Sequence, residues 1–499
     1  MTARRIVALP VDGRPVVREQ VQMLVANAGW ELAMPPVSAL GNMRVPADRN
    51  ALAGWLMQES PSATGFVISL DMLAYGGLVP SRFIDDPLER LEQFLALLPA
   101  LKAEHPDKPV YAFAATMRIS NNNVNEEEKT YWSEFGELIW RWSYFSDKHA
   151  LQGRAEDAAH ADEAMRAIPE HVRDDYLATR TRNRSLTLHA LDLVAAGVID
   201  RLVLPQDDTA EFGFNIAERR MLEQRIAELG VADKVLVYPG ADEVMHTLCA
   251  HMAGALSHTP PLAFYLSCGD PTRVEQLHAL YEDRPVLEAV ARQVAAAGAR
   301  LVASPDEADL ILAVHTRGTG QGDWAMTKPL PDPQPVSHTW LEQLAGWHGA
   351  GKPVALLDLA YANGGDPVLV GELAARLPLN KLAAYAGWNT ASNSIGSLVA
   401  QCVLARADLH AGGNQKVLAL RLLEDFLYQA VLRQTVRNSV RESDCGPEAL
   451  RDVVAQVFIG HANAWARAQG LGWEVYDVSL PWNRTFEINI QLRAAGWAQ

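Results

Sequence analysis

Two adjacent carboxylates, Asp207 and Asp208, are the residues of this 499-residue chain best suited to catalysis. They follow the apolar run Leu202–Leu204 and come directly after Gln206. Adjacent carboxylates that cannot both ionise freely have their pKa values pushed apart, so that one holds a proton while the other stays charged. The pair therefore predicts acid–base chemistry. The alternative is that one aspartate caps the helix that follows.

Polar side chains also follow four other apolar runs in the first half of the chain. The runs are Ile6–Leu9, Phe66–Leu70, Val110–Ala115 and Val235–Tyr238. Each is apolar on both faces, as parallel strands covered by helices are. Because such strands all end at one edge of a sheet, we predict that the side chains beyond them bind a substrate together with Gln206. These side chains belong to Asp12, Arg14, Asp71, Arg82, Arg118, Asn121, Asp242 and Glu243.

The arginines of this set, Arg14, Arg82 and Arg118, have two possible roles. They could hold a carboxylate or phosphate of a substrate in bidentate geometry. They could instead pair with the acids at the same sheet end. The chain has no glycine-rich phosphate loop after a strand and no HExxH or HxH pattern, so neither a nucleotide, a cofactor nor a metal is predicted.

The second half of the chain holds another group of polar residues after apolar runs. Its members are Asp358 and Asn363 after Val354–Leu357, and Trp388, Asn389 and Asn393 after Leu382–Ala386. An indole beside amides suits a sugar, because the sugar ring stacks on the indole and the amides bond the hydroxyls. Alternatively, the segment GWNT caps the next helix and Trp388 is packed. His315 is the best single histidine candidate for acid–base chemistry.

The alternation of apolar runs and amphipathic segments predicts right-handed βαβ units. A chain of 499 residues exceeds what one hydrophobic core usually supports. We predict a TIM-barrel-like (β/α) domain over residues 1–258, with a helical insert at 121–175 that folds over the sheet as a lid or side wall. A Rossmann-like α/β domain follows over 259–398, and a mainly helical C-terminal region covers 399–499.

Composition limits the partners and the location. The net charge of −16 argues against non-specific binding of nucleic acid, which needs a basic surface. The chain shows neither a signal peptide nor an apolar stretch long enough to span a bilayer. We therefore expect a cytoplasmic protein, not bound to a membrane, that binds a small molecule and could form a homo-oligomer.

Several long segments resemble a bacterial family known as a domain of unknown function, DUF4127. They include VALPVDGRP, SLDMLAYGGLVPSR, RISNNN, YPGADE, YAGWNTASNSIG and LPWNRTFEI. The resemblance covers nearly the whole chain and selects the same strand ends. The adjacent aspartates after a strand are also similar to the arrangement in hexosaminidases that use the acetamido group of the substrate, which is an analogy of fold class and dipeptide.

The predicted function is hydrolysis of small carbohydrates by a glycoside hydrolase of the N-acetylhexosaminidase kind. Asp208 would donate a proton to the leaving oxygen, and Asp207 would orient the acetamido group or stabilise the developing cation. Asp71 and Asp242 would bind hydroxyls. Two alternatives remain open: a metal-dependent hydrolase or lyase that uses the same carboxylates, and a non-catalytic protein that binds a sugar or metabolite.

Overall fold

The computed structural model describes residues 4–317, 320–326, 330 and 335–497. The chain divides into two compact units. Unit 1 consists of the chain up to Gly13, Glu31–Met245 and Tyr281–Asp283. Unit 2 consists of Arg14–Trp30, His246–Leu280 and the chain from Arg284 onward. Each unit contains a parallel sheet with helices, so the predicted α/β class is confirmed.

Unit 1 is built on a six-stranded sheet in which all neighbouring strands are parallel. The strands are β1 (Arg5–Leu9), β2 (Glu31–Ala33), β3 (Gly65–Ser69), β4 (Val110–Phe113), β5 (Arg201–Gln206) and β6 (Val235–Pro239). Their order is β2-β1-β3-β4-β5-β6. The predicted barrel is not confirmed, since no closed sheet occurs among the described residues. The chain adds β2 on one side of β1 and every later strand on the other, which leaves β2 and β6 as edges.

Helices cover the sheet of unit 1, which explains why its central strands are apolar on both faces. They are α2 (Arg49–Glu59), α3 (Leu70–Tyr75), α4 (Leu88–Leu95), α5 (Leu97–Glu104), α8 (Glu170–Ala195) and α9 (Phe214–Leu229). All residues of β3 are buried, and Phe66, Ile68 and Leu204 belong to the core between sheet and helices. Asp48 begins α2 by accepting hydrogen bonds from the backbone N–H groups of Asn50 and Ala51.

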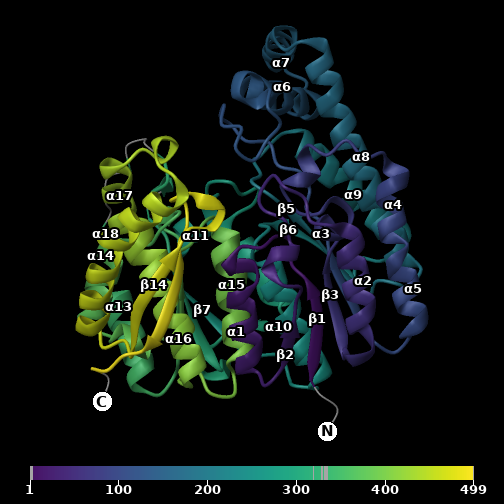
Figure 1. Ribbon diagram of the computed structural model, residues 1–499. Helices are drawn as coiled ribbons and strands as arrows, with labels where there is room; N and C mark the ends of the chain where they lie inside the picture. The colour runs from purple at the N-terminus through teal and green to yellow at the C-terminus, as the bar shows by residue number, and fades with distance from the viewer. Residues whose placement is uncertain (1–3, 318–319, 327–329, 331–334, 498–499) are drawn as a thin grey trace. The chain divides into compact units, whose positions relative to one another are not determined.

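Residues 121–175 of unit 1 contain α6 (Trp132–Gln152), α7 (Ala155–Ala167) and the start of α8. Figure 1 shows α6 and α7 beyond one end of the unit 1 sheet. The two helices pack against each other, and the aromatic residues of α6 supply a separate small core that includes Trp132 and Trp142. The polar segment that leads into α6 begins in the loop at the carboxyl end of β4.

Unit 2 is built on a five-stranded parallel sheet of order β13-β11-β9-β7-β8. The strands are β7 (Ala263–Cys268), β8 (Arg300–Val302), β9 (Leu310–His315), β11 (Val354–Asp358) and β13 (Ala384–Ala386). Helices that pack in this unit include α1 (Glu19–Asn27), α12 (Val286–Ala296), α13 (His338–Gly349), α14 (Pro367–Ala374) and α15 (Ala391–Leu404). A short parallel pair, β10 (Gly322–Asp323) and β12 (Tyr361–Ala362), lies beyond the strand ends.

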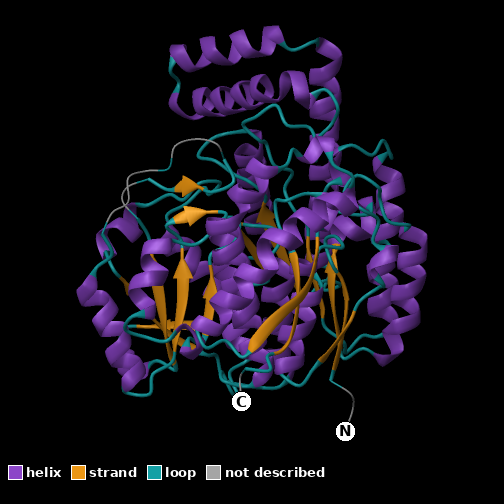
Figure 2. Ribbon diagram, turned by 60° about the vertical axis from the view of Figure 1, so that its left-hand side comes forward, coloured by secondary structure: helices purple, strands orange, loops and turns teal. Residues whose placement is uncertain are grey.

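The last hundred residues are helical but end in a hairpin. Helix α16 (Gly412–Arg421) continues into a π-helical segment, Leu422–Leu432, and then α17 (Arg433–Ser439) and α18 (Pro447–Ala468). The antiparallel strands β14 (Trp473–Ser479) and β15 (Asn489–Ala494) close the chain; strands are orange in Figure 2. Among the described residues, no helix combines the length and the apolar character needed to cross a bilayer.

The two sheets share one strand order. Counted along the chain within each unit, both run 2-1-3-4-5, with a sixth strand added in unit 1. This is a doubly wound order, in which the chain reverses direction across the sheet after the second strand. Ligands of such sheets bind beyond the carboxyl ends of the strands, where the polar segments of this chain lie.

Candidate active site

Arg82 joins the carboxyl ends of three neighbouring strands in unit 1. It follows β3, its side chain is 2% exposed, and its Nη2 lies 2.8 Å from Oδ2 of Asp207 after β5. Its Nη1 lies 3.2 Å from Glu128 Oε1 and 3.4 Å from Glu127 Oε2, both in the segment after β4. Side chains far apart in the sequence therefore meet at one sheet edge, as parallel strands predict.

Arg118 makes a second set of contacts with the same acids. Its Nε lies 2.8 Å from Glu128 Oε1, its Nη2 lies 3.2 Å from Glu127 Oε2, and its Nη1 lies 3.0 Å from Asp208 Oδ2. Two arginines thus form ion pairs with four carboxylates, so the group has more acidic than basic side chains. We call these residues the carboxylate cluster: Arg82, Arg118, Glu127, Glu128, Asp207 and Asp208. Both arginines therefore pair with acids at the same sheet end, which is one of the two roles that the sequence left open for them.

The environment of the aspartate pair favours a shared proton. Burial, followed by the charge of Asp208, raises the pKa of Asp207 to about 7, against the opposing effect of Arg82 and Arg118. Burial also raises the pKa of Asp208, and Arg118 opposes that shift. Two neighbouring carboxylates that repel each other titrate as a pair. Near neutral pH this pair therefore keeps a proton that ordinary aspartates would have lost.

The backbone at Asp208 explains how both aspartates reach one cluster. In a regular strand, neighbouring side chains point to opposite faces. Asp208 has a φ of 33°, in the left-handed region that only glycine and a few polar residues adopt readily. This bend ends the alternation at β5, so Asp207 contacts Arg82 while Asp208 contacts Arg118. Strained backbone of this kind is concentrated at functional sites.

Asp71 is a buried acid next to the cluster. It lies in the first turn of α3, is 2% exposed, and its Oδ2 accepts a hydrogen bond from the backbone N–H of Ala115 at 2.9 Å. Burial raises the pKa of Asp71 to about 7, and the charge of Arg82 opposes the rise. The group is therefore protonated over much of the range in which an ordinary aspartate is charged.

Gln206, Asp242 and Glu243 continue the site toward β6. Gln206 pairs with Pro239 in the sheet, and its Nε2 donates to Thr116 Oγ1 at 3.0 Å. Asp242 is buried, and its charge helps to raise the pKa of Asp207. Glu243 accepts a hydrogen bond from the backbone N–H of Ala241 at 3.0 Å. Burial raises the pKa of Glu243 well above its ordinary value.

The remaining predicted residues of the first rim are Asp12, Asn121 and Arg14. Asp12 is buried directly after β1, in the last residues of the first segment of unit 1. Asn121 is exposed. Arg14 belongs to unit 2, where its Nη1 lies 3.7 Å from Glu487 Oε1 and its guanidinium lies 4.5 Å from the ring of Trp482. Arg14 therefore has partners from the C-terminal segment LPWNRTFEI.

Two members of the cluster, Glu127 and Glu128, are not among the residues predicted from the sequence. They stand in the run NEEEKT, and a run of charged residues usually marks a solvated surface. Glu128 is instead buried, at 5% exposure, because it binds both arginines. Their position in the sequence could have indicated them, because the run NEEEKT belongs to the same segment after β4 that carries Arg118.

Unit 2 has its own network of buried charges. His315 Nε2 lies 3.0 Å from Asp366 Oδ2, and Arg317 Nε lies 3.3 Å from the same oxygen. Asp358 Oδ2 accepts hydrogen bonds from the backbone N–H of Asp366 at 2.7 Å and from the hydroxyl of Tyr385 at 3.1 Å. We call these five residues the His315 network. It holds the ends of β9, β11 and β13 together.

The pKa values of the two acids in the His315 network move in opposite directions. Burial raises the pKa of Asp358 to about 6, although the charge of His315 opposes the rise. Burial also acts to raise the pKa of Asp366, but the hydrogen bond and the charge of His315 outweigh it, so the pKa of Asp366 lies below its ordinary value. Asp366 also accepts a hydrogen bond from the N–H of Val368 and thereby caps α14.

The predicted sugar-binding residues of unit 2 are engaged in turns and caps. Asn363 and Asn389 both have a φ of 57°, and the N–H of Asn363 donates to the carbonyl of Asn389 at 2.9 Å. Asn363 Nδ2 donates to Asp323 Oδ1 at 2.9 Å. These two asparagines occupy left-handed backbone positions that asparagine tolerates better than most residues.

Trp388 is only 3% exposed, and its carbonyl accepts a hydrogen bond from the hydroxyl of Ser394 at 2.8 Å. Thr390 caps α15, and its Oγ1 accepts the side-chain amide of Asn393 at 3.1 Å. These contacts match the capping alternative for GWNT, and sugar binding by Trp388 stays a prediction.

Metal-ligand geometry is absent from the described part of the chain. No group of three or more histidine, cysteine, aspartate or glutamate side chains there could hold a metal ion. The four cysteines are free thiols.

The strand order and the carboxylate cluster together define a doubly wound α/β protein with an acid-rich site at its strand ends. The chain belongs to the DUF4127 family, whose description is "Protein of unknown function" and whose model matches residues 6–491. The resemblance found in the sequence is thereby confirmed over nearly the whole chain. No curated protein matches the chain.

Proposed function

We propose that the protein is a hydrolase of small carbohydrates, specifically a glycoside hydrolase, and that the carboxylate cluster is its active site. The observation that carries the proposal is the aspartate pair: burial and the charge of Asp208 raise the pKa of Asp207 to about 7. Glycosidic bond cleavage requires one carboxylic acid that protonates the leaving oxygen and a second, charged carboxylate. One shared proton on two aspartates supplies both forms.

The pKa of Asp207 supports a revised division of roles. The sequence assigned proton donation to Asp208, whereas a pKa of about 7 favours Asp207 as the member that carries the proton at neutral pH. Asp208 has the more exposed side chain, at 27% against 13% for Asp207, and it is ion-paired with Arg118. In the proposed mechanism, Asp208 stabilises the developing positive charge or orients the acetamido group of the substrate.

The charge of the cluster limits the classes of sugar that the proposed enzyme could bind. Arg118 already contacts three carboxylates, and four acids face two arginines. A further acidic group would compete with Glu127, Glu128 and Asp208 for these cations. The proposed substrate is therefore a neutral or basic sugar, such as an N-acetylated or free amino sugar, whose hydroxyls Asp71 and Asp242 would bind.

Chromogenic glycosides, including N-acetylhexosaminides, test the proposal on wild type and on Asp207→Asn and Asp208→Asn. General acid–base catalysis contributes about 10²–10⁴-fold, so each variant should lose at least about 100-fold in kcat on any cleaved glycoside. Asp233→Asn, at an exposed aspartate of the same unit, is the matched control and should retain full activity. Unchanged turnover in both cluster variants would overturn the proposal.

The pH dependence provides a second test of the same site. If Asp207 is the proton donor, kcat/KM should fall as pH rises through about 7, because the donor loses its proton there. Asp208→Asn removes the neighbouring charge that helps to raise the pKa of Asp207. The alkaline limb of the residual activity should therefore move to lower pH, and a limb that stays in place would contradict the assignment.

A further inference from the structure

An arginine outside the carboxylate cluster, Arg44, holds the main chain that carries Glu127 and Glu128. It lies in the loop between β2 and α2 of unit 1. Its guanidinium lies 4.5 Å from the centre of the ring of Phe83. Its Nη1 donates to three backbone carbonyls of one turn, those of Asn125 at 3.1 Å, Glu126 at 3.3 Å and Glu128. Arg44 therefore binds the backbone of the acidic segment, whereas Arg82 and Arg118 bind its carboxylates.

Arg44 projects from a tight turn with a strained backbone. Asn42 and Val45 exchange two backbone hydrogen bonds, at 2.9 and 2.7 Å, and Met43 between them has a φ of 41°. Gly41 has a φ of 67°, and a Cβ there would lie 2.1 Å from the carbonyl oxygen of Val45. Asn42 and Val45 are exposed, so core packing does not impose this conformation. Strained backbone that the core does not require is concentrated at functional sites.

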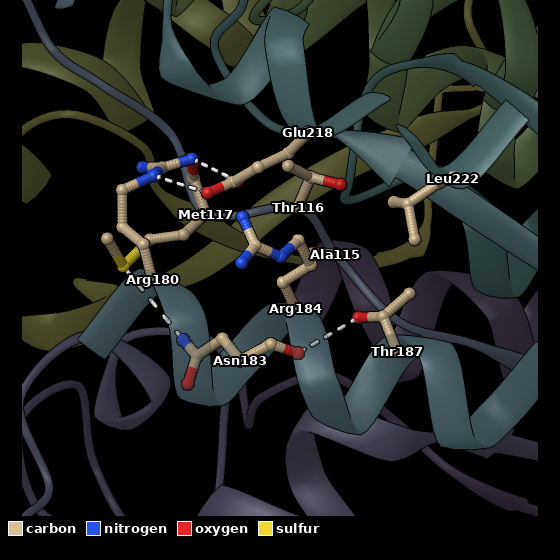
Figure 3. A pocket seen from close by; sticks show the side chains of 9 residues that line it. All are labelled: Ala115, Thr116, Met117, Arg180, Asn183, Arg184, Thr187, Glu218 and Leu222. Carbon is tan, nitrogen blue, oxygen red and sulfur yellow. Dashed lines mark hydrogen bonds and ion pairs between the residues drawn. The ribbon is translucent and has the colours of Figure 1, made fainter. Parts of the chain in front are cut away.

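The start of the same segment is held by another arginine that binds a carbonyl. Arg180 of α8 donates to the carbonyl of Met117 at 3.0 Å, and the carboxylate of Glu218 in α9 accepts from Arg180 at 2.9 and 2.6 Å. Figure 3 shows this ion pair beside Met117. Arg118 follows Met117 directly, so Arg180 holds the main chain next to Arg118. The stretch that enters the cluster is therefore held at its start by Arg180 and at its end by Arg44.

The position of the two glutamates affects the aspartate pair through charge and through burial. The charged side chains that face the pair, from the segments after β3, β4 and β6, are Arg82, Arg118, Glu127, Glu128 and Asp242. Burial raises the pKa of Asp208, the charges of the glutamates add to this rise, and those of the arginines oppose it. If the glutamates withdrew, the arginines would face the aspartates with less competition, and more water would reach the pair. Each of these changes lowers the pKa values of the aspartates.

We propose that Arg44 is a positioning residue, which holds Glu127 and Glu128 against the two arginines of the carboxylate cluster. It acts through the main chain and contacts neither Asp207 nor Asp208. As a statement about catalysis this inference rests on the proposed function, because a correctly placed cluster keeps a proton on the aspartate pair at neutral pH. The arrangement of the cluster does not rest on it, and a titration measures that arrangement without a substrate.

The titration of Asp207, followed by NMR of protein labelled with ¹³C at the aspartate carboxyl groups, tests this role. Asp207→Asn assigns the signal. In Arg44→Met the segment loses three hydrogen bonds, so the pKa of Asp207 should fall from about 7 by about one pH unit. Loss of a positive charge alone would raise this pKa, so the direction separates positioning from simple attraction. Arg154→Met, at an exposed arginine of the same unit, is the charge-matched control and should titrate as wild type does.

Arg44→Lys should restore most of the wild-type titration, because an ammonium group also donates to carbonyls. Gly41→Ala changes no charge, and its added Cβ forces the turn open, so it should lower the pKa of Asp207 as Arg44→Met does.

The inference is overturned if the pKa of Asp207 stays or rises in Arg44→Met, or in Gly41→Ala where Arg44→Met does not fold. Absence of glycoside cleavage by wild type would overturn the proposed function alone. Where a glycoside is cleaved, the alkaline limb of kcat/KM should move to lower pH in Arg44→Met by the same amount as the NMR titration.

Discussion

The carboxylate cluster of unit 1 and the His315 network of unit 2 lie at the carboxyl ends of sheets with the same strand order, yet they differ in openness. The side chains of Asp207 and Asp208 are 13% and 27% exposed, whereas that of Asp366 is completely buried. Asp366 is also held by a histidine, an arginine and a helix cap. The same position in a doubly wound sheet can thus leave acids partly exposed or bury them in contacts that hold loops in place.

Asp71 and Asp207 also differ from Asp366 in the direction of their pKa shifts. Burial raises the pKa values of Asp71 and Asp207 to about 7, so folding makes these acids hold protons. His315 and Arg317 keep the pKa of Asp366 below its ordinary value despite burial. The stability that each acid contributes should therefore depend on pH with opposite sign. If the proposed function holds, this difference separates an acid kept for reactivity from one kept for structure.

Removal of Arg82 should have the largest effect on stability. Arg82→Met removes the ion pair of Asp207 and leaves Glu127 and Glu128 with Arg118 alone, and loss of one partner of a buried pair costs about 3–5 kcal/mol. With three acids affected, we expect a loss near 5 kcal/mol in urea unfolding at pH 7. The loss should shrink at pH 5, where the stranded acids can take up protons. Arg154→Met serves as the exposed control, and an equal loss at both pH values would argue against the cluster.

Asp366→Asn tests the structural role of the His315 network. Asparagine also caps helices well, so α14 keeps its cap while the ion pairs with His315 and Arg317 are lost. We expect a loss of about 3 kcal/mol in the free energy of unfolding at pH 7. Because the folded pKa of Asp366 is lowered, its contribution is present above about pH 4 and disappears as pH falls through the folded pKa.

Asp366→Ala should cost about 1 kcal/mol more than Asp366→Asn, through loss of the cap. If both variants unfold at the same urea concentration as wild type, the acid does not fasten its loop.

Asp71→Asn should behave in the opposite way and stabilise the protein at high pH. With a folded pKa of about 7 against about 4 in the unfolded chain, wild type loses stability as pH rises between these values. This shift corresponds to about 4 kcal/mol, and an unpaired amide in the variant offsets about half of it. Near pH 4, where the wild-type acid is protonated, we expect the variant to be about 2 kcal/mol less stable, and above pH 7 about 2 kcal/mol more stable, in urea unfolding. A variant that is less stable than wild type at pH 8 would contradict the raised pKa.

Strand ends and their polar segments could be predicted from the sequence, because a buried parallel strand must be apolar and its ligand-binding loop need not be. The pairing of Asp207 and Asp208 with arginines was left open, since either role fits a strand end. The sequence pattern could not show whether the sheet closes into a barrel. Successive βαβ units have the same pattern of apolar runs and helices whether β2 lies at the edge of an open sheet or between two neighbouring strands. The sequence grouped Arg14 with the strand ends of unit 1 for a related reason: the chain leaves unit 1 at Gly13, and no composition change marks that point.

Asp208→Gly should have the smallest effect on stability and gives the sharpest contrast with Asp366. The φ of 33° at Asp208 costs an L-residue on the order of 1 kcal/mol, and glycine avoids this strain. Glycine also removes a carboxylate that repels Asp207, but it loses the ion pair with Arg118 and adds freedom to the unfolded chain. These contributions nearly cancel, so we expect a change within about 1 kcal/mol in urea unfolding, together with the loss of any glycosidase activity. A strained, like-charged residue that can be removed at no cost in stability is retained for a reason other than folding, whereas a large loss here would place Asp208 with Asp366 among the structural acids.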